Sequence, residues 1–384
     1  MRIIEFSDTF YPIMDGVGNV VFQYATHLGR KGHECYVVAP ETDTGWRGGW
    51  PFELVDYRGV RIPRLKSYEA GLPRMDLHYA RRMNMIQADI VHAHSPFLSG
   101  REAQAYARKR KVPLVASFHS KYYDDFLQIT NNERLAKIGT QKVVHFYEQC
   151  DEVWAVSESS AETLRSYGYK GPLRVMTNGM DIPEPDPEAV AEVTERYELD
   201  ALPVLLFVGQ MNWKKNLDCV LEAAAGLERD FRLVFAGQGP HEKEIRRRAK
   251  QLGLSERTVF TGHLTDRRLL NALYARADLF LFPSLYDNAP MVLREAAAVG
   301  TPAVVVRGSS TAEVVHDGVN GFHCENDPAD LRRVIDAALA DPAAMAAVGA
   351  KAKETIPVPW DRLIDQVLDR YAELVRVHRI VAQD

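Results

Sequence analysis

Two acidic residues flank a polar turn in the second half of the chain, and their spacing suits a sugar nucleotide. The apolar run 278–283 leads into Ser284–Pro302, where Asp287 and Glu295 lie eight residues apart around Pro290. Proline suits the first position of a helix, so we expect a helix to begin there. Free N–H groups at a helix start attract phosphate, and carboxylates accept hydrogen bonds from hydroxyl groups. The stretch therefore predicts binding of a sugar nucleotide.

Both acids also have ordinary structural explanations. Asp287 could be only a helix N-cap, and Glu295 could be only a solvent-facing helix residue. Glu295, however, interrupts a largely apolar segment, where an unpaired charge would be costly. We therefore expect a partner to hold Glu295 in place.

Three further strand-like runs of the second half end in glycine and polar residues. These residues are Gly209, Gln210, Lys214, Lys215, Gly237, Gly262, His263 and Leu264. A solvated surface side chain is the simplest account of either lysine alone, although a cation there could meet a diphosphate. With Ser284–Pro302, the runs make four polar turns after four strands. This recurrence favours a ligand site at the carboxyl ends of a parallel sheet.

The first half shows weaker signals of the same kind. Gly16 and Gly18 follow the first strand-like run and are predicted to open a helix, where glycine lets backbone approach a ligand. A tight turn without a ligand explains them as well.

Histidines gather at the ends of two predicted strands of the first half. His92 and His94 lie in one run and His119 ends another, so their rings could face a ligand. A metal site is the weaker interpretation, because the HxH spacing has no acidic third ligand nearby. A structural role is the default for each ring alone. His119, which polar residues follow, is the first functional candidate.

Length and composition limit the class of protein. A chain of 384 residues with 46% apolar and 26% charged residues suits two globular domains. A formal net charge of −5 argues against nucleic acid as a partner. Four separated cysteines favour neither disulfides nor zinc and suit the cytosol. No signal peptide or transmembrane segment is expected, and peripheral membrane attachment stays open.

Short apolar runs alternate with helical patterns along both halves, which predicts an α/β fold of two doubly wound parallel sheets. The expected strands are 2–7, 35–39, 89–94, 114–119, 152–156 and 174–176, then 204–208, 233–236, 259–261, 279–282 and 303–306. Helices are expected over 17–30 and 101–109. The segment 52–66 is predicted to form an added hairpin that turns at Arg58 and Gly59.

Proline-rich breaks suggest the domain limits. Three prolines in Asp181–Pro187 predict a linker, so the first domain is expected over 1–182 and the second over 183–361. After the break Ile356–Trp360, residues 362–384 contain a helical pattern whose apolar stripe needs a partner.

The combined pattern resembles the retaining glycosyltransferases of family 4, whose GT-B fold has two Rossmann-like domains facing across a cleft. The family's two glutamates, separated by seven residues, resemble Asp287 and Glu295, with aspartate first. The likeness implies that Glu295 binds the ribose hydroxyls. It implies that Asp287 and the backbone of Asn288, Ala289 and Met291 hold the sugar and phosphates.

The resemblance extends to other residues. The donor-binding residues that it implies are Gly16, Gly18, Gly209, Gln210, Lys215, Gly237, Gly262, His263, Leu264, Asp287, Asn288, Ala289, Pro290, Met291 and Glu295. The family's Arg-x4-Lys pair resembles Gln210 and Lys215, and a neutral amide cannot replace a bidentate cation. His119 resembles the family histidine near the sugar. The last helix resembles the one that crosses back to the first domain.

The likeness implies transfer of a hexose from a nucleoside-diphosphate sugar with retention at the anomeric carbon. The catalytic candidates are His119, Asp287 and Lys215. The lysine, backbone N–H groups and a helix dipole would stabilise the leaving diphosphate, so neither a metal nor a cofactor is expected. Front-face attack without a protein nucleophile is expected, and Asp287 as nucleophile is the less favoured alternative.

The first half most resembles the branch that glucosylates diacylglycerol, through its Phe10-Tyr-Pro turn and aromatic residues after Phe118. This implies a UDP-sugar, UDP-glucose first, and a lipid hydroxyl acceptor. The acceptor-side candidates are Asp15, His94, Tyr122 and Tyr123. The cations 108–111 could attract an anionic inner membrane face. A soluble acceptor such as a sugar or aminocyclitol is the alternative.

Two hypotheses from other classes stay open. A sugar-nucleotide 2-epimerase shares the implied architecture and needs no acceptor. A non-catalytic module would bind the nucleotide and leave the sugar bond intact. Self-association is also left open.

Overall fold

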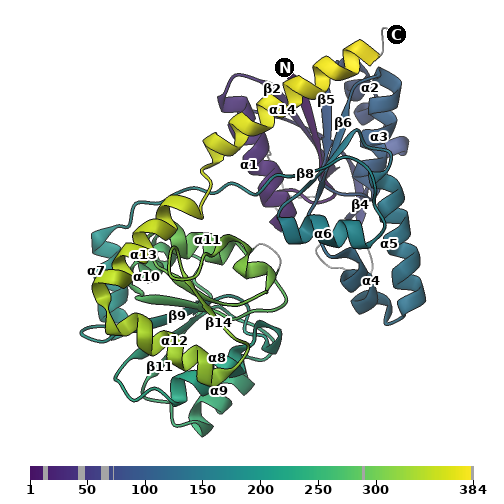
Figure 1. Cartoon of the computed structure of the whole chain (residues 1–384). Helices are drawn as coiled ribbons and strands as arrows, with labels where there is room; N and C mark the ends of the chain where they lie inside the picture. The colour runs from purple at the N-terminus through teal and green to yellow at the C-terminus, as the bar shows by residue number, and fades with distance from the viewer. Residues whose placement is uncertain (12–15, 42–47, 62–68, 72, 288–289, 382–384) are drawn as a thin grey trace. The chain divides into compact units, whose positions relative to one another are not determined.

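The chain forms two compact units (Figure 1). The computed structural model describes residues 1–11, 16–41, 48–61, 69–71, 73–287 and 290–381. Unit 1 comprises residues 1–179 and 360–384, and unit 2 comprises residues 180–359. The chain thus passes between the units after Gly179 and after Pro359, where the sequence predicts limits after residues 182 and 361.

Unit 1 is built on an eight-stranded sheet in the order β4-β3-β2-β1-β5-β6-β7-β8. Its strands are β1 (Arg2–Phe6), β2 (Glu34–Glu41), β3 (Glu53–Arg61), β4 (Glu69–Gly71), β5 (Ile90–Ala93), β6 (Leu114–Phe118), β7 (Glu152–Ala155) and β8 (Leu173–Val175). Neighbours are parallel except β3 and β4. Every residue of β5 and β6 is buried, as expected when helices cover both faces of a parallel sheet.

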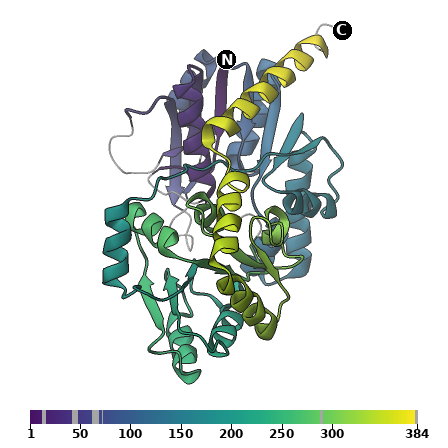
Figure 2. The same cartoon turned by 60° about the vertical axis from the view of Figure 1, so that its left-hand side comes forward.

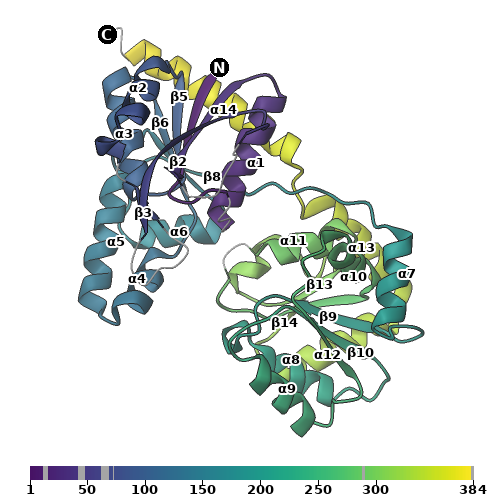
Figure 3. The same ribbon diagram turned by 180° about the vertical axis from the view of Figure 1, so that it is seen from behind.

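Helices cover both faces of this sheet. They are α1 (Gly16–Arg30), α2 (Leu77–Met85), α3 (Leu98–Arg110), α4 (Tyr122–Thr130), α5 (Glu133–Tyr147), α6 (Glu158–Ser166) and α14 (Trp360–Val381), with a 3₁₀ turn η1 (Pro73–Met75). Figures 1 and 3 show α1 and α14 on one face and α3 and α5 on the other.

The C-terminal helix α14 belongs to unit 1, as its resemblance to a returning helix predicts. Its apolar stripe is buried: Leu363, Ile364 and Val367 have no exposed surface. Two contacts hold it beside α1: His27 Nδ1 hydrogen-bonds Asp361 Oδ1 at 3.1 Å, and Lys31, which follows α1, forms an ion pair with Asp365 at 2.8 Å. Figure 2 shows α14 lying along unit 1 beside α1.

The predicted hairpin turn at Arg58 and Gly59 is wrong. Strand β3 runs through both residues, because it pairs in parallel with β2 and so continues as part of the sheet. The antiparallel partner is β4, which meets β3 at Gly59 and Gly71. A Cβ on Gly71 would lie 1.8 Å from the ring of Tyr57, so glycine permits this close pairing.

Unit 2 is built on a six-stranded parallel sheet in the order β11-β10-β9-β12-β13-β14. Its strands are β9 (Val204–Val208), β10 (Arg232–Ala236), β11 (Thr258–Gly262), β12 (Leu279–Phe282), β13 (Ala303–Val306) and β14 (Phe322–Cys324). The sequence did not reveal β14, because three residues in a polar context show no periodicity.

Unit 2 also has helices on both faces of its sheet. They are α7 (Pro187–Arg196), α8 (Leu217–Ala225), α9 (Glu242–Gln251), α10 (Arg267–Arg276), α11 (Met291–Ala298), α12 (Pro328–Ala340) and α13 (Pro342–Thr355), with 3₁₀ turns η2 (Trp213–Lys215) and η3 (Ser310–Val314). Figures 1 and 3 show α10, α11 and α13 on one face and α8, α9 and α12 on the other.

Each sheet has one point where strand order reverses. It lies between β1 and β5 in unit 1 and between β9 and β12 in unit 2. Open α/β sheets bind ligands outside the carboxyl ends of strands at such a point. The predicted site residues follow β1, β5 and β6 in unit 1, and β9, β10, β11 and β12 in unit 2. The topology therefore gathers them at the carboxyl edge of each sheet.

Candidate functional site

The turn after β12 holds Asp287 by two hydrogen bonds. Ser284 Oγ donates to Asp287 Oδ2 at 2.6 Å, and Lys215 Nζ donates to Asp287 Oδ1 at 2.5 Å. Ser284 Oγ also accepts from the Tyr286 N–H at 3.3 Å, which tightens the turn. Asp287 is therefore bound to side chains on both oxygens, and it is not the N-cap of α11.

Helix α11 begins at Met291, one residue later than predicted. Pro290 is its N-cap residue and makes no side-chain hydrogen bond to the first turn. The start of a helix carries N–H groups without an intrahelical partner, which favours an anion at this place. Asn288 and Ala289, predicted to contact the sugar and phosphates, lie outside the described residues.

The two lysines of η2 have different environments. Lys215 is 17% exposed and pairs with Asp287, which is 20% exposed. Lys214 is exposed, and its Nζ lies 5.2 Å from the ring centroid of Tyr286. The surface interpretation thus describes Lys214, whereas Lys215 places a cation beside the turn that follows β12.

Glu295 lies one turn into α11 and has two partners from α10. Its Oε2 accepts from Tyr274 Oη at 3.0 Å, and its Oε1 pairs with Arg267 Nη2 at 2.9 Å. Burial, and then the charge of Glu295, raise the pKa of Tyr274, so this hydroxyl stays a donor. The side chain of Glu295 is only 13% exposed, so it is not a solvent-facing helix residue.

The carboxylate of Glu295 keeps capacity for a ligand. An ionised carboxylate has about four acceptor positions on its two oxygens. Tyr274 and Arg267 each use one of them. Two neighbouring hydroxyl groups could therefore bind without displacing either partner.

Glycines bring the loops after β9, β10 and β11 into contact. The Gly209 N–H donates to Ala236 O at 3.0 Å, and the Gly237 N–H donates to Gly262 O at 2.8 Å. Gly237 has φ of 137°, and a Cβ there would lie 2.0 Å from Gly209 O. Only glycine fits this position, so the close packing of the loops depends on it.

The packed loops line a cavity of about 320 Å³ in unit 2 that is open to solvent. Its lining residues are Val208, Gly209, Gln210, Ala236, Gly237, Gln238, His263, Leu264 and Leu270. Five of these were predicted to bind the donor. None of the lining residues is a lysine or arginine. Gln210, which stands in place of the family arginine, is exposed and accepts a long bond from Asn212 Nδ2 at 3.5 Å.

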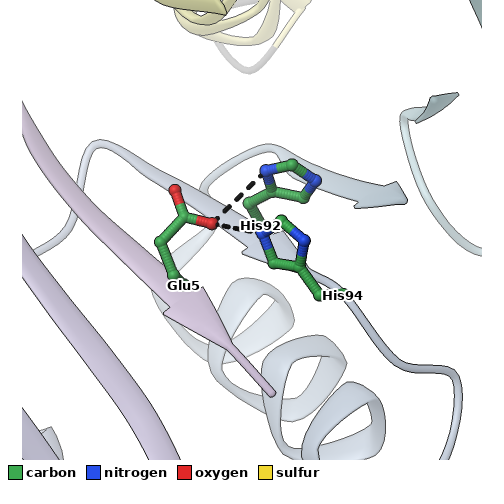
Figure 4. Close-up of side chains that lie close together, drawn as sticks. All are labelled: Glu5, His92 and His94. Atoms are coloured by element: carbon green, nitrogen blue, oxygen red, sulfur yellow. Dashed lines mark hydrogen bonds and ion pairs between the residues drawn. The ribbon is translucent and has the colours of Figure 1, made fainter. Parts of the chain in front are cut away.

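A buried polar cluster lies at the reversal point of unit 1 (Figure 4). Glu5 Oε2 lies 2.7 Å from His94 Nε2 and 3.4 Å from His92 Nδ1. Tyr371 Oη on α14 bonds to His92 Nδ1 at 2.5 Å and to Glu5 Oε1 at 3.2 Å. His92 Nε2 bonds to Ser117 Oγ at 2.8 Å. The helix α14 thus supplies part of the cluster.

Burial shifts the titration of this cluster. It raises the pKa of Glu5 to about 8 and lowers that of His94 to about 3. It also lowers the pKa of His92 well below its ordinary value. Both histidines are therefore neutral at pH 7, where burial also favours the protonated form of Glu5.

The histidine pair does have an acidic neighbour, contrary to the sequence prediction. The atoms of Glu5, His92 and His94 that could ligate a metal lie within 4.8 Å of one another. Pairing of β1 with β5 brings Glu5 beside the two histidines. The HxH spacing could not show this contact, because Glu5 is distant in the sequence. These atoms are engaged in hydrogen bonds with one another, Tyr371 and Ser117. We therefore interpret the group as a hydrogen-bonded cluster and assign no metal to it.

The other predicted residues of unit 1 divide by exposure. His119 is half-buried, and its Nε2 bonds to His94 Nδ1 at 3.2 Å. Its neighbour His94 is 1% exposed, so its ring is not accessible for direct contact with an acceptor. Tyr122 is 6% exposed and packs against Phe118.

Three predicted positions remain in unit 1. Gly16 opens α1 as predicted, and Gly18 is buried within its first turn. The backbone N–H of Tyr123 donates to Tyr167 Oη at 3.3 Å. Asp15 lies outside the described residues.

The basic run 108–111 lies away from these residues. It ends α3 and precedes β6, so it is at the amino edge of the sheet, opposite the end that carries His119. Lys109 Nζ donates to Asn84 Oδ1 at 2.6 Å, and Arg110 lies over the Tyr106 ring. Within the described ranges, no helix has the length and apolarity that crossing a bilayer requires.

The two halves match two family descriptions. Residues 14–184 match "Glycosyltransferase Family 4", and residues 186–355 match "Glycosyl transferases group 1". A "GDP-mannose-dependent alpha-(1-6)-phosphatidylinositol monomannoside mannosyltransferase" of Mycolicibacterium smegmatis is 31% identical over 92% of this chain and 93% of its own. The chain belongs to the family 4 glycosyltransferases of the GT-B type.

Other similar proteins have names that give different sugars or nucleotides. A "GDP-mannose-dependent alpha-mannosyltransferase" of Corynebacterium glutamicum is 28% identical over 98% of this chain and 89% of its own. An "Alpha-monoglucosyldiacylglycerol synthase" of Streptococcus pneumoniae is 26% identical over 89% and 79%. The crystal structure of Anabaena Alr3699/HepE with UDP has a TM-score of 0.75 at 17% identity, covering 97% of this chain and 99% of that one. It supports the predicted fold.

Several residues of these sites were not predicted. Tyr274 and Arg267 hold Glu295. Ser284 hydrogen-bonds Asp287, and Tyr371 hydrogen-bonds Glu5. A polar residue inside an apolar strand, as at Glu5, was the one available signal. The rule that flagged Glu295 applies equally to it.

Proposed function

We propose that the protein transfers a hexose from a nucleoside-diphosphate hexose to a lipid hydroxyl, with retention at the anomeric carbon. The observation that carries this proposal is the arrangement at the reversal point of unit 2. There Lys215, Asp287 and the start of α11 come together, with Glu295 one turn further along the helix. A lysine cation, the N–H groups of a helix start and two carboxylates suit a diphosphate joined to two sugars.

The diphosphate would bind at the start of α11. The N–H groups of a helix start and the helix dipole favour an anion there, and Lys215 adds a positive charge. These groups gain strength as negative charge develops on the departing diphosphate. Because Gln210 supplies no cation, Lys215 and the helix start would carry this stabilisation.

The nucleoside would extend along the same edge of the sheet. Glu295 has acceptor positions for both ribose hydroxyls, as the family likeness implies. The neighbouring cavity of about 320 Å³ combines apolar and backbone polar groups, which suits a flat base. The segment Gly262–Leu264 would supply the contacts that distinguish one base from another.

The bonding changes of the transfer balance without a cofactor. The bond from the anomeric carbon to the diphosphate oxygen breaks, and a bond to the acceptor oxygen forms on the same face. The acceptor proton passes to the released diphosphate. In this front-face course Asp287 positions the sugar and does not form a covalent bond. His119 is kept as a catalytic candidate on the family likeness.

Two donors deserve direct comparison. GDP-mannose is the first candidate, because two of the relatives above are named for it. UDP-glucose, the sequence-based expectation, is the second, and the relative named as a glucosyldiacylglycerol synthase favours it. A lipid acceptor is favoured because two relatives have lipids in their names.

The test is a transfer assay with each donor and with vesicles that contain diacylglycerol or phosphatidylinositol. We expect one donor to yield a glycolipid, with the anomeric configuration of the donor shown by proton NMR. An inverted product would refute retention, and transfer only to soluble sugars or aminocyclitols would refute the lipid acceptor. Conversion of donor alone to another sugar would indicate an epimerase. Binding without turnover of any donor would indicate a non-catalytic module.

A further inference from the structure

A buried chain of hydrogen bonds links Glu5 on β1 to the ring of His119 after β6. Glu5 Oε2 lies 2.7 Å from His94 Nε2, and His94 Nδ1 lies 3.2 Å from His119 Nε2. The two rings are nearly parallel, with 15° between their planes. Glu5 is 0% and His94 is 1% exposed, so water does not compete for these bonds.

Among the residues that the structure describes, the neighbours of Glu5 provide hydrogen bonds and no permanent cation. Tyr371 on α14 lies 3.2 Å from Oε1, and His92 on β5 lies 3.4 Å from Oε2. Tyr24 on α1 and Cys35 on β2 are buried nearby, and their pKa values are raised by burial first and by the charge of Glu5 second. Either protonation state of Glu5 can therefore be satisfied by the same neighbours.

Two proton arrangements fit these hydrogen bonds, because a neutral histidine has one donor and one acceptor nitrogen. When Glu5 is ionised, His94 donates from Nε2 to the carboxylate, and His119 donates from Nε2 to His94 Nδ1. When Glu5 is protonated, it donates to His94 Nε2, and His94 donates from Nδ1 to His119 Nε2. His119 then carries its own proton on Nδ1.

We propose that Glu5 and His94 are positioning residues that set which nitrogen of His119 carries the proton. Going from the protonated to the ionised arrangement, the Glu5 proton moves to His94 Nε2 and the His94 Nδ1 proton moves to His119 Nε2. The proton that leaves the three residues is the one on His119 Nδ1. The hydrogen bonds from Glu5 through His94 thus let a neutral His119 release or take up a proton.

The hydrogen-bonded relay of Glu5, His94 and His119 gives His119 a pH dependence that its own ring would not have. Burial raises the pKa of Glu5 to about 8. Below that pH, His119 Nδ1 is a hydrogen-bond donor, and above it the same nitrogen is an acceptor. Use of this change in hexose transfer rests on the proposed function, whereas the relay itself does not.

The tautomer can be read directly by NMR of the protein labelled with ¹⁵N-histidine. In the wild-type protein we expect His119 to be protonated on Nδ1 at pH 7 and on Nε2 at pH 9.5. In Glu5→Gln, the amide donates to His94 while its oxygen accepts from Tyr371, so His119 should keep the Nδ1 proton at both pH values. Ser117→Ala removes a partner of His92 outside the relay and should switch like the wild type.

The outcomes are distinct. One His119 tautomer across pH 7 to 9.5 in the wild type would overturn the proposal, and this arm needs no substitution. A wild-type switch that persists in Glu5→Gln would overturn the role of Glu5. In active enzyme, kcat should show an inflection near pH 8 that Glu5→Gln removes. If no transfer is found, the proposed function fails while the NMR result still decides the relay.

Discussion

Replacing Glu295 with glutamine tests the ribose contact most cleanly. The amide has nearly the size of the carboxylate and can still accept from Tyr274, so the fold should persist. What it loses is charge. Charge-assisted hydrogen bonds are roughly twice as strong as neutral ones, and each contributes about 2 kcal/mol. Two ribose bonds weakened by half would reduce affinity by about 2 kcal/mol, roughly 30-fold in Kd.

Isothermal titration with GDP and UDP would measure this change. Arg267→Ala is the matched control, because it removes the other partner of Glu295 from a side chain that is 62% exposed. An exposed ion pair contributes at most about 1 kcal/mol, so the control should change Kd less than roughly fivefold. A Kd for Glu295→Gln within twofold of wild type would refute the ribose assignment.

Three further predictions concern other parts of the molecule. Lys215→Ala should lower kcat/KM at least about tenfold, or about 1.4 kcal/mol, and Lys214→Ala much less; equal effects would contradict the assignment. Gly237→Ala forces a Cβ against Gly209 O and should lower the unfolding free energy in urea by at least about 2 kcal/mol; an unchanged midpoint would be inconsistent with the packed loops. The pKa of Glu5 is about 8 in the folded protein and about 4.5 in the unfolded chain. The free energy of unfolding therefore falls as pH rises towards 8. Between pH 6.5 and 8, wild-type protein should lose about 2 kcal/mol relative to Glu5→Gln in urea unfolding, and parallel pH curves would contradict this.

Much of the architecture follows from local patterns. Continuous apolar runs predicted the buried strands, because parallel strands covered on both faces need no polar alternation. The apolar stripe within residues 362–384 predicted a helix that must be covered, and α14 packs within unit 1. The turn at Arg58 and Gly59 failed, because an available sheet edge extended β3 past residues that favour turns.

Candidate site residues could be chosen from the sequence where the local pattern around each of them was unusual. Asp287, Glu295 and Lys215 could be chosen because each follows a strand or interrupts an apolar face. Their partners could not, since Tyr274 and Tyr371 are ordinary core aromatic residues in the sequence. Pairing of β1 with β5 likewise brings Glu5 to the histidines over a separation that no local pattern reports.

The central claim is that unit 2 binds the nucleoside diphosphate at the turn between β12 and α11. Methyl NMR of protein labelled at methionine tests it directly, because Met291 begins α11 and Met211 lies in the loop after β9. Titration with GDP or UDP should shift both methyl resonances saturably and leave Met83, in the core of unit 1, in place. Saturable shifts confined to Met83, or no methyl shifts with either nucleotide, would contradict the account.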